Sequence, residues 1–118
     1  MAFEWNYRYT DKAIEDLDQI IAYISEKLSN KKAASDFLNE LDSTISILTS
    51  FPKSGTLVKN HYLHDANVRF TLINSYTLYY YPDYEKQSII ILRLVYGRRD
   101  PDYVYGQLKN QFSSKNIR

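Results

Sequence analysis

Two consecutive runs of apolar residues with helical spacing constrain this chain more than any other feature. The first run recurs at steps of three and four, which places its side chains on one helix face: Ile14, Leu17, Ile21, Ile24 and Leu28. The second run has similar spacing: Ala34, Phe37, Leu38, Leu41, Ile45 and Leu48. Thr10 or Asp11 offers an N-cap to the first run, Ser29-Asn30 separates the two, and Phe51-Pro52 ends the second. Because the linker is so short, the sequence predicts an antiparallel helical hairpin.

Strand patterns flank this hairpin on both sides. Aromatic and polar residues alternate over residues 3–8, which predicts a short N-terminal strand. After a predicted loop at 53–66, three more strands are expected, at 68–73, 77–81 and 88–96. Because the turns between them are short, at Asn74-Ser75 and 82–86, these three form an antiparallel meander.

A short C-terminal helix at residues 101–112 completes the predicted fold, with a frayed tail at 112–118. The prediction is a single α+β domain over residues 1–118. In it the hairpin covers one face of a single twisted sheet.

Composition removes several classes of function. The chain has no cysteine, and its two histidines, His61 and His64, do not make a metal site without further ligands. It shows neither a nucleophile elbow nor a phosphate-binding glycine loop. No apolar run approaches the roughly 18–20 residues that span a bilayer, and no signal peptide opens the chain. We therefore expect a soluble, cytoplasmic protein without metal, cofactor or membrane contact.

Opposite charges occupy different segments, although the net charge is only +1. Residues 11–42 carry eight acidic and four basic side chains, whereas residues 93–118 carry six basic and two acidic ones. This separation indicates two different kinds of contact, with two ordinary solvated surfaces as the alternative.

Cations and tyrosines cluster toward the end of the chain: Arg93, Tyr96, Arg98, Arg99, Tyr103 and Tyr105. If the helices cover the face that carries Ile90, Leu92 and Leu94, strand alternation leaves Arg93 on the open face. The same reasoning leaves Arg69 opposite Phe70 and Leu72, which are assigned to the covered face. Such a mixture suits single-stranded nucleic acid or a protein hot spot, although tyrosine is also simply a good strand former.

Four segments, spread over about residues 5–108, resemble the motifs of one family. Residues 13–24, Ala-Ile-Glu-Asp-Leu-Asp-Gln-Ile-Ile-Ala-Tyr-Ile, resemble its first helix. Residues 48–55, Leu-Thr-Ser-Phe-Pro-Lys-Ser-Gly, resemble its exit from the hairpin. Val68-Arg69 with residues 76–80 resembles its central strands, and residues 90–100 resemble its last strand, which ends in Val-Tyr-Gly-Arg-Arg-Asp. Together the four segments resemble the RelE/ParE toxin superfamily.

The resemblance implies the toxin of a type II toxin–antitoxin pair, neutralised in a hetero-oligomer by a cognate antitoxin. It also implies a twisted antiparallel sheet braced by a helical hairpin. The superfamily divides by target, because RelE-like members cut mRNA on the ribosome and ParE-like members inhibit DNA gyrase.

The nuclease pattern carries over only in part. Three functional positions of the nucleases are matched here, by Arg69 in the first central strand, Arg99 after the last strand and Tyr105 in the C-terminal segment. In a nuclease, Tyr96 or Tyr105 would assist proton transfer. Thr71 and Thr77 stand where cations are usual, and each missing cation removes roughly 2.7–4 kcal/mol of charge stabilisation. The resemblance therefore favours a non-enzymatic gyrase inhibitor, with a ribosome-dependent mRNA endonuclease or a degenerate toxin that only binds antitoxin as alternatives.

Binding to an acidic antitoxin or to the target is assigned to Arg93, Arg98 and Arg99. This interpretation places Arg69 and Arg93 outward on an antiparallel sheet, where they meet a macromolecule.

Overall fold

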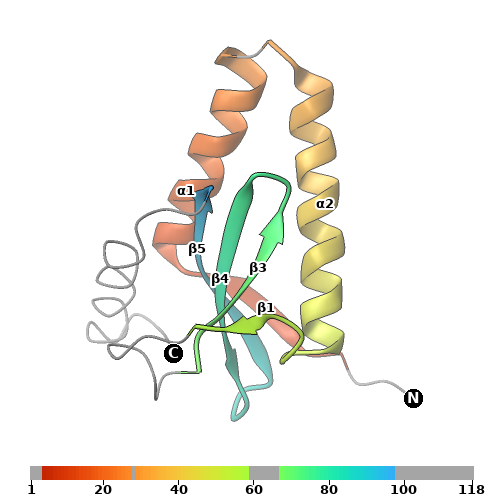
Figure 1. Cartoon of the computed structure of the whole chain (residues 1–118), viewed down its shortest axis with the longest axis vertical. Coiled ribbons are helices and arrows are strands. Elements are labelled where there is room, and N and C mark those ends of the chain that lie inside the picture. Colours follow the sequence, from red (N-terminus) through yellow and green to blue (C-terminus); the bar gives the residue numbers. More distant parts are fainter. Residues whose placement is uncertain (1–3, 28, 59–66, 98–118) are drawn as a thin grey trace.

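A helical hairpin packs against one face of a five-stranded sheet in the computed structural model, which describes residues 4–27, 29–58 and 67–97 (Figure 1). The elements run in the order β1 (Asn6–Tyr9), α1 (Asp11–Ala22), η1 (Tyr23–Lys27), α2 (Lys31–Ser50), β2 (Thr56–Leu57), β3 (Arg69–Ile73), β4 (Tyr76–Asp83) and β5 (Ser88–Tyr96). The predicted α+β class is confirmed, with its N-terminal strand, helical hairpin and meander. The predicted C-terminal helix at 101–112 lies outside the described residues.

Side-chain caps begin both helices where the sequence predicts them. The Thr10 hydroxyl accepts a hydrogen bond from the Ala13 amide at 3.1 Å, and the Asn30 side-chain oxygen accepts one from Ala33 at 2.9 Å. α1 continues into a π-helical turn, η1, where the Ser25 hydroxyl donates to the carbonyl of Ile21. The hairpin therefore follows from local chemistry at its ends and from apolar stripes along its length.

The strands lie in the order β1-β5-β4-β3-β2. β3, β4 and β5 form the predicted antiparallel meander, but β1 pairs with β5 in parallel, so the expectation of a wholly antiparallel sheet is wrong. Tight turns impose antiparallel pairing only on consecutive strands, and β1 is separated from β5 by the rest of the domain.

Two strand boundaries also differ from the prediction. β2 forms inside the segment assigned to a loop, by pairing Thr56 with Phe70. β4 runs through Pro82 to Asp83, where a turn was expected. Since the last pair between β3 and β4 is Arg69 with Tyr80, β4 has a partner on one side only where the proline falls.

Apolar side chains cover both faces of the sheet. The larger cluster lies between sheet and helices and includes Ile20, Phe37, Leu41, Leu48, Leu78, Tyr80, Ile89, Ile91 and Leu94. The smaller cluster lies on the opposite face: Val58, Val68, Tyr79, Ile90 and Leu92, with Phe70, Tyr81 and Val95 packed against it.

The predicted orientation of the strands was therefore wrong at two places. Ile90, Leu92 and Phe70 were assigned to the helix side and lie on the other. Tyr79 and Tyr80 of β4 pair with Arg93 and Ile91 of β5, so Leu92 is an extra residue in β5 and forms a β-bulge. Because β5 is apolar almost throughout, alternation could not fix its orientation. Within the described residues, no helix is long and apolar enough to cross a membrane.

Candidate functional site

Arg93 does not face outward as predicted. Its Nε and Nη2 atoms donate to the two carboxylate oxygens of Asp16 in α1, at 2.6 and 3.1 Å. The same carboxylate accepts the backbone amide of Leu94 at 3.1 Å, beside β5. The side chains of Arg93 and Asp16 are only 12% and 9% exposed.

This ion pair fastens α1 to the edge of β5. β1 covers that edge only from Ser88 to Ile91, so the following stretch needs other partners for its backbone. The Asp16 carboxylate supplies one, and the Thr10 hydroxyl supplies another by donating to the carbonyl of Leu92 at 3.1 Å. Charge, burial and hydrogen bonding together indicate a structural use of Arg93.

Arg69 is also held by the protein itself. It pairs with Tyr80, a member of the cluster beneath the helices, so Arg69 lies on the helix side of the sheet and the predicted open-face position is wrong. Its Nη1 atom donates to the carbonyls of Gly55 at 2.9 Å and Lys53 at 3.2 Å. Its Nε atom is shielded from solvent and makes no hydrogen bond within the described residues.

Tyr80, the β4 partner of Arg69, holds the same turn through its hydroxyl group. Its hydroxyl donates to the carbonyl of Pro52 at 2.8 Å and accepts from the Gly55 amide at 2.9 Å. A Cβ atom at position 55 would lie 2.6 Å from this hydroxyl and 2.8 Å from the carbonyl of Phe70, which explains the glycine in the hairpin-exit motif. Burial raises the pKa of Tyr80, while the Gly55 amide and the Arg69 charge oppose the rise.

The remaining predicted site residues fall into two groups. Arg98, Arg99 and Tyr105 lie outside the described residues, so the site as a whole stays a prediction. Tyr96 ends β5 and is 60% exposed. Thr77 is 3% exposed and its hydroxyl donates to the carbonyl of Gly97 at 2.9 Å, while Thr71 is partly exposed in β3. Neither threonine replaces the charge of a cation.

A group of aromatic rings that the sequence did not predict gathers where the hairpin extends past the sheet. Tyr23, Tyr76 and Tyr96 form this group, which we call the tip tyrosine cluster. The ring of Tyr76 contacts Phe37 with centroids 5.2 Å apart and Tyr96 with centroids 5.4 Å apart. Burial raises the pKa of Tyr76, and the neighbouring phenols of Tyr23 and Tyr96 raise it further.

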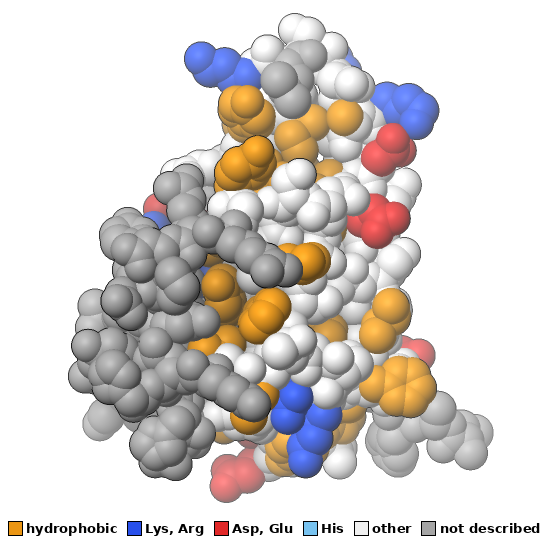
Figure 2. Space-filling view, in the orientation of Figure 1, with side chains coloured by type: hydrophobic (Ala, Val, Ile, Leu, Met, Phe, Trp, Pro, Cys, Tyr) orange, Lys and Arg blue, Asp and Glu red, His pale blue; other side chains and the backbone are white. Residues whose placement is uncertain are grey.

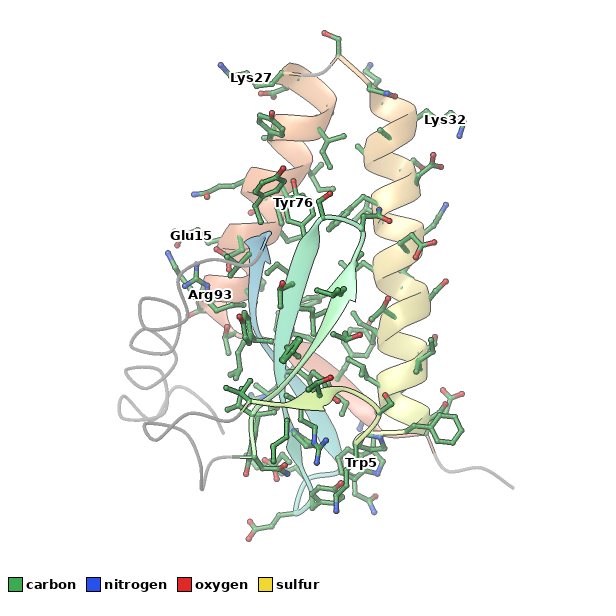
Figure 3. The ribbon with its side chains drawn as sticks, in the orientation of Figure 1. Trp5, Glu15, Lys27, Lys32, Tyr76 and Arg93 are labelled. Atoms are coloured by element: carbon green, nitrogen blue, oxygen red, sulfur yellow. The ribbon has the colours of Figure 1, made fainter. Side chains whose placement is uncertain are left out.

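Tyr23 offered one cue in the sequence, because it is an aromatic residue outside the apolar stripe of the first helix. Figure 3 shows Tyr76 between the two helices, above the ends of the strands.

Among the described residues, no three His, Cys, Asp or Glu side chains come together in a way that could hold a metal ion.

Comparison with solved structures identifies the fold as that of bacterial toxins. A chain of the chromosomal ParDE TA system from P. aeruginosa superimposes with a TM-score of 0.62 at 18% identity, covering 80% of this chain and 98% of that one. The RelBE2 complex of Mycobacterium tuberculosis gives 0.56 at 20% identity, covering 85% and 98%. The isolated E. coli RelE toxin gives 0.51 at 12% identity, covering 90% and 98%.

Sequence comparison then assigns the family. The model for the ParE toxin of type II toxin–antitoxin systems, parDE, matches residues 7–101. No curated protein matches the chain by sequence. The chain belongs to the ParE toxin family, within the RelE/ParE superfamily that the sequence motifs indicated. The family match therefore holds although β1 pairs with β5 in parallel and Arg93 is bound by Asp16, two features that differ from the predictions made from the sequence.

Proposed function

We propose that this protein is neutralised by a cognate antitoxin and, when released from it, inhibits DNA gyrase in the cytoplasm. The observation that carries the proposal is the engagement of Arg69 and Arg93 by the protein itself. Both arginines were assigned to an exposed cationic surface, and a nuclease of this superfamily would need such a surface for its RNA substrate.

The chemistry of RNA cleavage explains why this engagement matters. Attack by a 2′-hydroxyl develops negative charge on the phosphate, which donors positioned at that phosphate must stabilise. The Nη1 atom of Arg69 is directed at two backbone carbonyls, and the guanidinium of Arg93 is directed at Asp16. Thr71 and Thr77 supply no charge in their place. These features favour inhibition by binding over catalysis.

An antitoxin partner fits the charge distribution of the sequence. Residues 93–118 carry six basic side chains against two acidic ones, so an acidic segment is the complementary partner. Antitoxin segments that fold on binding bury apolar side chains, and the toxin exposes Ile47, Phe51 and Leu57 at the end of α2 and after it. The two proteins would then form a toxin–antitoxin hetero-oligomer.

A supercoiling assay with purified gyrase tests the proposal. We expect the full-length toxin to inhibit supercoiling and to provoke gyrase-dependent DNA breaks. The same toxin mixed beforehand with its antitoxin should be inactive, which is the matched control. Full supercoiling in the presence of excess folded toxin would contradict the gyrase proposal.

A second assay addresses the alternative of mRNA cleavage. Primer extension on a translated message should reveal no new cuts in the ribosomal A site when the toxin is added. New cuts that disappear with antitoxin would replace the gyrase proposal with a nuclease. Normal growth after induction of the toxin alone would point to a degenerate toxin.

A further inference from the structure

The sheet face that lies opposite the hairpin is apolar and buried. Its five central side chains, which we call the outer cluster, are at most 7% exposed: Val58, Val68, Tyr79, Ile90 and Leu92. Among the described residues, none from the helices α1, η1 and α2 belongs to this cluster. Figure 2 shows hydrophobic side chains over the strands as well as along the hairpin. Because a buried apolar face needs a covering layer, a second layer is required on this side of the sheet.

The end of β5 directs the chain toward this face. Thr77 of β4 pairs with Val95, which packs against the outer cluster, so the two side chains lie on the same face of the sheet. Thr77 is 3% exposed, and its hydroxyl donates to the carbonyl of Gly97 at 2.9 Å. The chain therefore leaves β5 from a carbonyl that is held on the side of the outer cluster.

Gly97 itself makes the turn possible. Its φ is 64°, a conformation that residues with a side chain rarely adopt. Its amide donates to the carbonyl of Ser75 at 2.6 Å. Together with the bond from Thr77, this hydrogen bond fixes the direction in which residues 98–118 depart.

The sequence after this turn has the pattern that a covering helix needs. Residues 101–112 carry apolar side chains at helical spacing, which one face of a helix would present together: Val104, Tyr105, Leu108 and Phe112. The opposite face would carry Asp102, Gly106 and Asn110. A helix over this range is about 18 Å long, and Ile90 lies about 20 Å back along β5 from Tyr96, so the helix is long enough to cover the cluster.

Such a helix would depend on the sheet for its stability. A helix of this length is marginal in water, and Gly106 in its middle weakens it further. It would therefore form when its apolar face is buried. The match to the ParE family ends at residue 101, so most of this segment is additional to the part that the family shares.

We propose that residues 101–112 dock on the outer cluster as an amphipathic helix, with Val104, Leu108 and Phe112 against the sheet. Asn110 then lies in solvent, and Tyr105 is turned toward the sheet and away from any RNA. Thr77 is the positioning residue, because its hydroxyl holds the carbonyl from which the segment departs. This face is thus occupied by the chain itself and is closed to partners.

Thiol labelling of the full chain tests the docked helix. The sequence has no cysteine, so the variants Leu108→Cys and Asn110→Cys each provide a single thiol. In the folded protein, a maleimide should react at least about tenfold more slowly at position 108 than at 110, because a buried thiol reacts only after local opening. In urea that unfolds the protein, the two rates should agree. Equal rates in the folded protein overturn the proposal.

The reciprocal experiment places the thiol on the sheet. Val95→Cys is partly buried beside the outer cluster. In this background Leu108→Asp should speed labelling at least about fivefold, because a carboxylate cannot be buried against apolar side chains without cost. Asn110→Asp is the matched control and should change the rate less than about twofold, since it adds the same charge on the solvent side. Equal effects of the two substitutions, or none from Leu108→Asp, contradict the docking.

A third measurement addresses Thr77. In the Leu108→Cys background, Thr77→Val should raise the labelling rate about fivefold, as expected for the loss of one hydrogen bond. Thr77→Ser retains the hydroxyl and should restore the slow rate. A slow rate in the Thr77→Val variant would remove Thr77 from the proposal. Circular dichroism verifies that every variant is folded.

The docked helix does not rest on the proposed target. If the toxin fails to inhibit gyrase while the thiol at position 108 is protected, the gyrase function fails and the docking stands. If the toxin inhibits gyrase while the thiols at positions 108 and 110 react equally, the function stands and the docking is wrong.

Discussion

The two ends of the helical hairpin are fixed to the molecule by different chemistry. At the base, where α1 begins and α2 ends, buried polar groups hold the chain: Asp16 binds Arg93 and Leu94, and Tyr80 binds Pro52 and Gly55. Toward the tip, the partly buried ring of Tyr76 packs against the ring of Tyr96, and the side chains of Tyr96 and Tyr23 are more than half exposed. Figure 1 shows the tip projecting beyond the strands.

This difference separates residues that maintain the fold from residues whose side chains remain largely in solvent. A buried ion pair is costly to break, because the remaining charge has no water around it. A half-exposed ring buries less apolar surface and contributes less to folding. Substitutions at the base are therefore expected to reduce stability more than substitutions at the tip.

The largest effect is expected from Asp16→Ala. Removal of the carboxylate takes away both hydrogen bonds and the opposite charge that Asp16 gives to the buried Arg93 guanidinium, which costs about 3–5 kcal/mol in the free energy of unfolding. Urea denaturation measures the loss. Glu15→Ala is the matched control, because Glu15 is exposed and pairs with Lys12 across one helical turn, and it should cost under about 0.5 kcal/mol. Similar costs for the two variants would show that the buried ion pair with Arg93 is not what holds the base of the hairpin.

A smaller loss is expected from Tyr80→Phe. The substitution keeps the ring in the core but leaves the Pro52 carbonyl and the Gly55 amide without their partner, at a cost of about 1–3 kcal/mol. Thermal unfolding measures it. Tyr84→Phe serves as the control, because Tyr84 contacts Trp5 through its ring, which phenylalanine retains. Wild-type stability of the Tyr80 variant would show that the turn after α2 is held by Arg69 alone.

Alkaline pH should lower the free energy of unfolding by a comparable or smaller amount, through Tyr9 beside the start of α1. Burial, aided by Tyr7 and Asp42, raises the pKa of Tyr9 to about 12, against 10.0 for an ordinary tyrosine. The folded state therefore keeps a neutral phenol that the unfolded chain would ionise. This contribution is present below pH 10 and is lost as the pH rises from 10 to 12. Because solvent still reaches part of the ring, the loss is on the order of 1 kcal/mol. The Tyr9→Phe variant should lack this part of the pH dependence, which unfolding curves at pH 9 to 12 would reveal.

The smallest change in stability is expected from Tyr23→Ala. More than half of this side chain is in solvent, and its replacement should alter the free energy of unfolding by less than about 1 kcal/mol. Denaturation curves that overlay those of wild type within this range would sharpen the contrast with Asp16→Ala. A loss as large as that of Asp16→Ala would place Tyr23 among the residues that maintain the fold.

The order of elements could be predicted from the sequence because local features specify it. Apolar spacing indicated both helices, and Thr10 and Asn30 cap them as their side chains suggest. The meander followed from its short turns. In contrast, the parallel pairing of β1 depends on contacts about eighty residues apart, for which local spacing carries no information.

The candidate site was harder to predict, since it depended on which way the strands face. The sequence did contain one warning: Asp16 lies within the apolar stripe of α1, between Ala13 and Ile20, both of which are buried. A carboxylate in that position requires a cationic partner, and Arg93 is 77 residues away. The tip tyrosine cluster likewise combines side chains from a helix and two strands, so no single segment identifies it.

The extra residue at Leu92 limits how roles can be transferred between relatives of this protein. Before it, Ile89 and Ile91 are directed toward the helices; after it, Leu94 is. A homologue without the insertion would carry every later side chain of β5 on the opposite surface, even when the letters of the two sequences match. An arginine aligned with Arg93 could then reach a ligand in one toxin and a helix in another, and the length of this strand would decide between them.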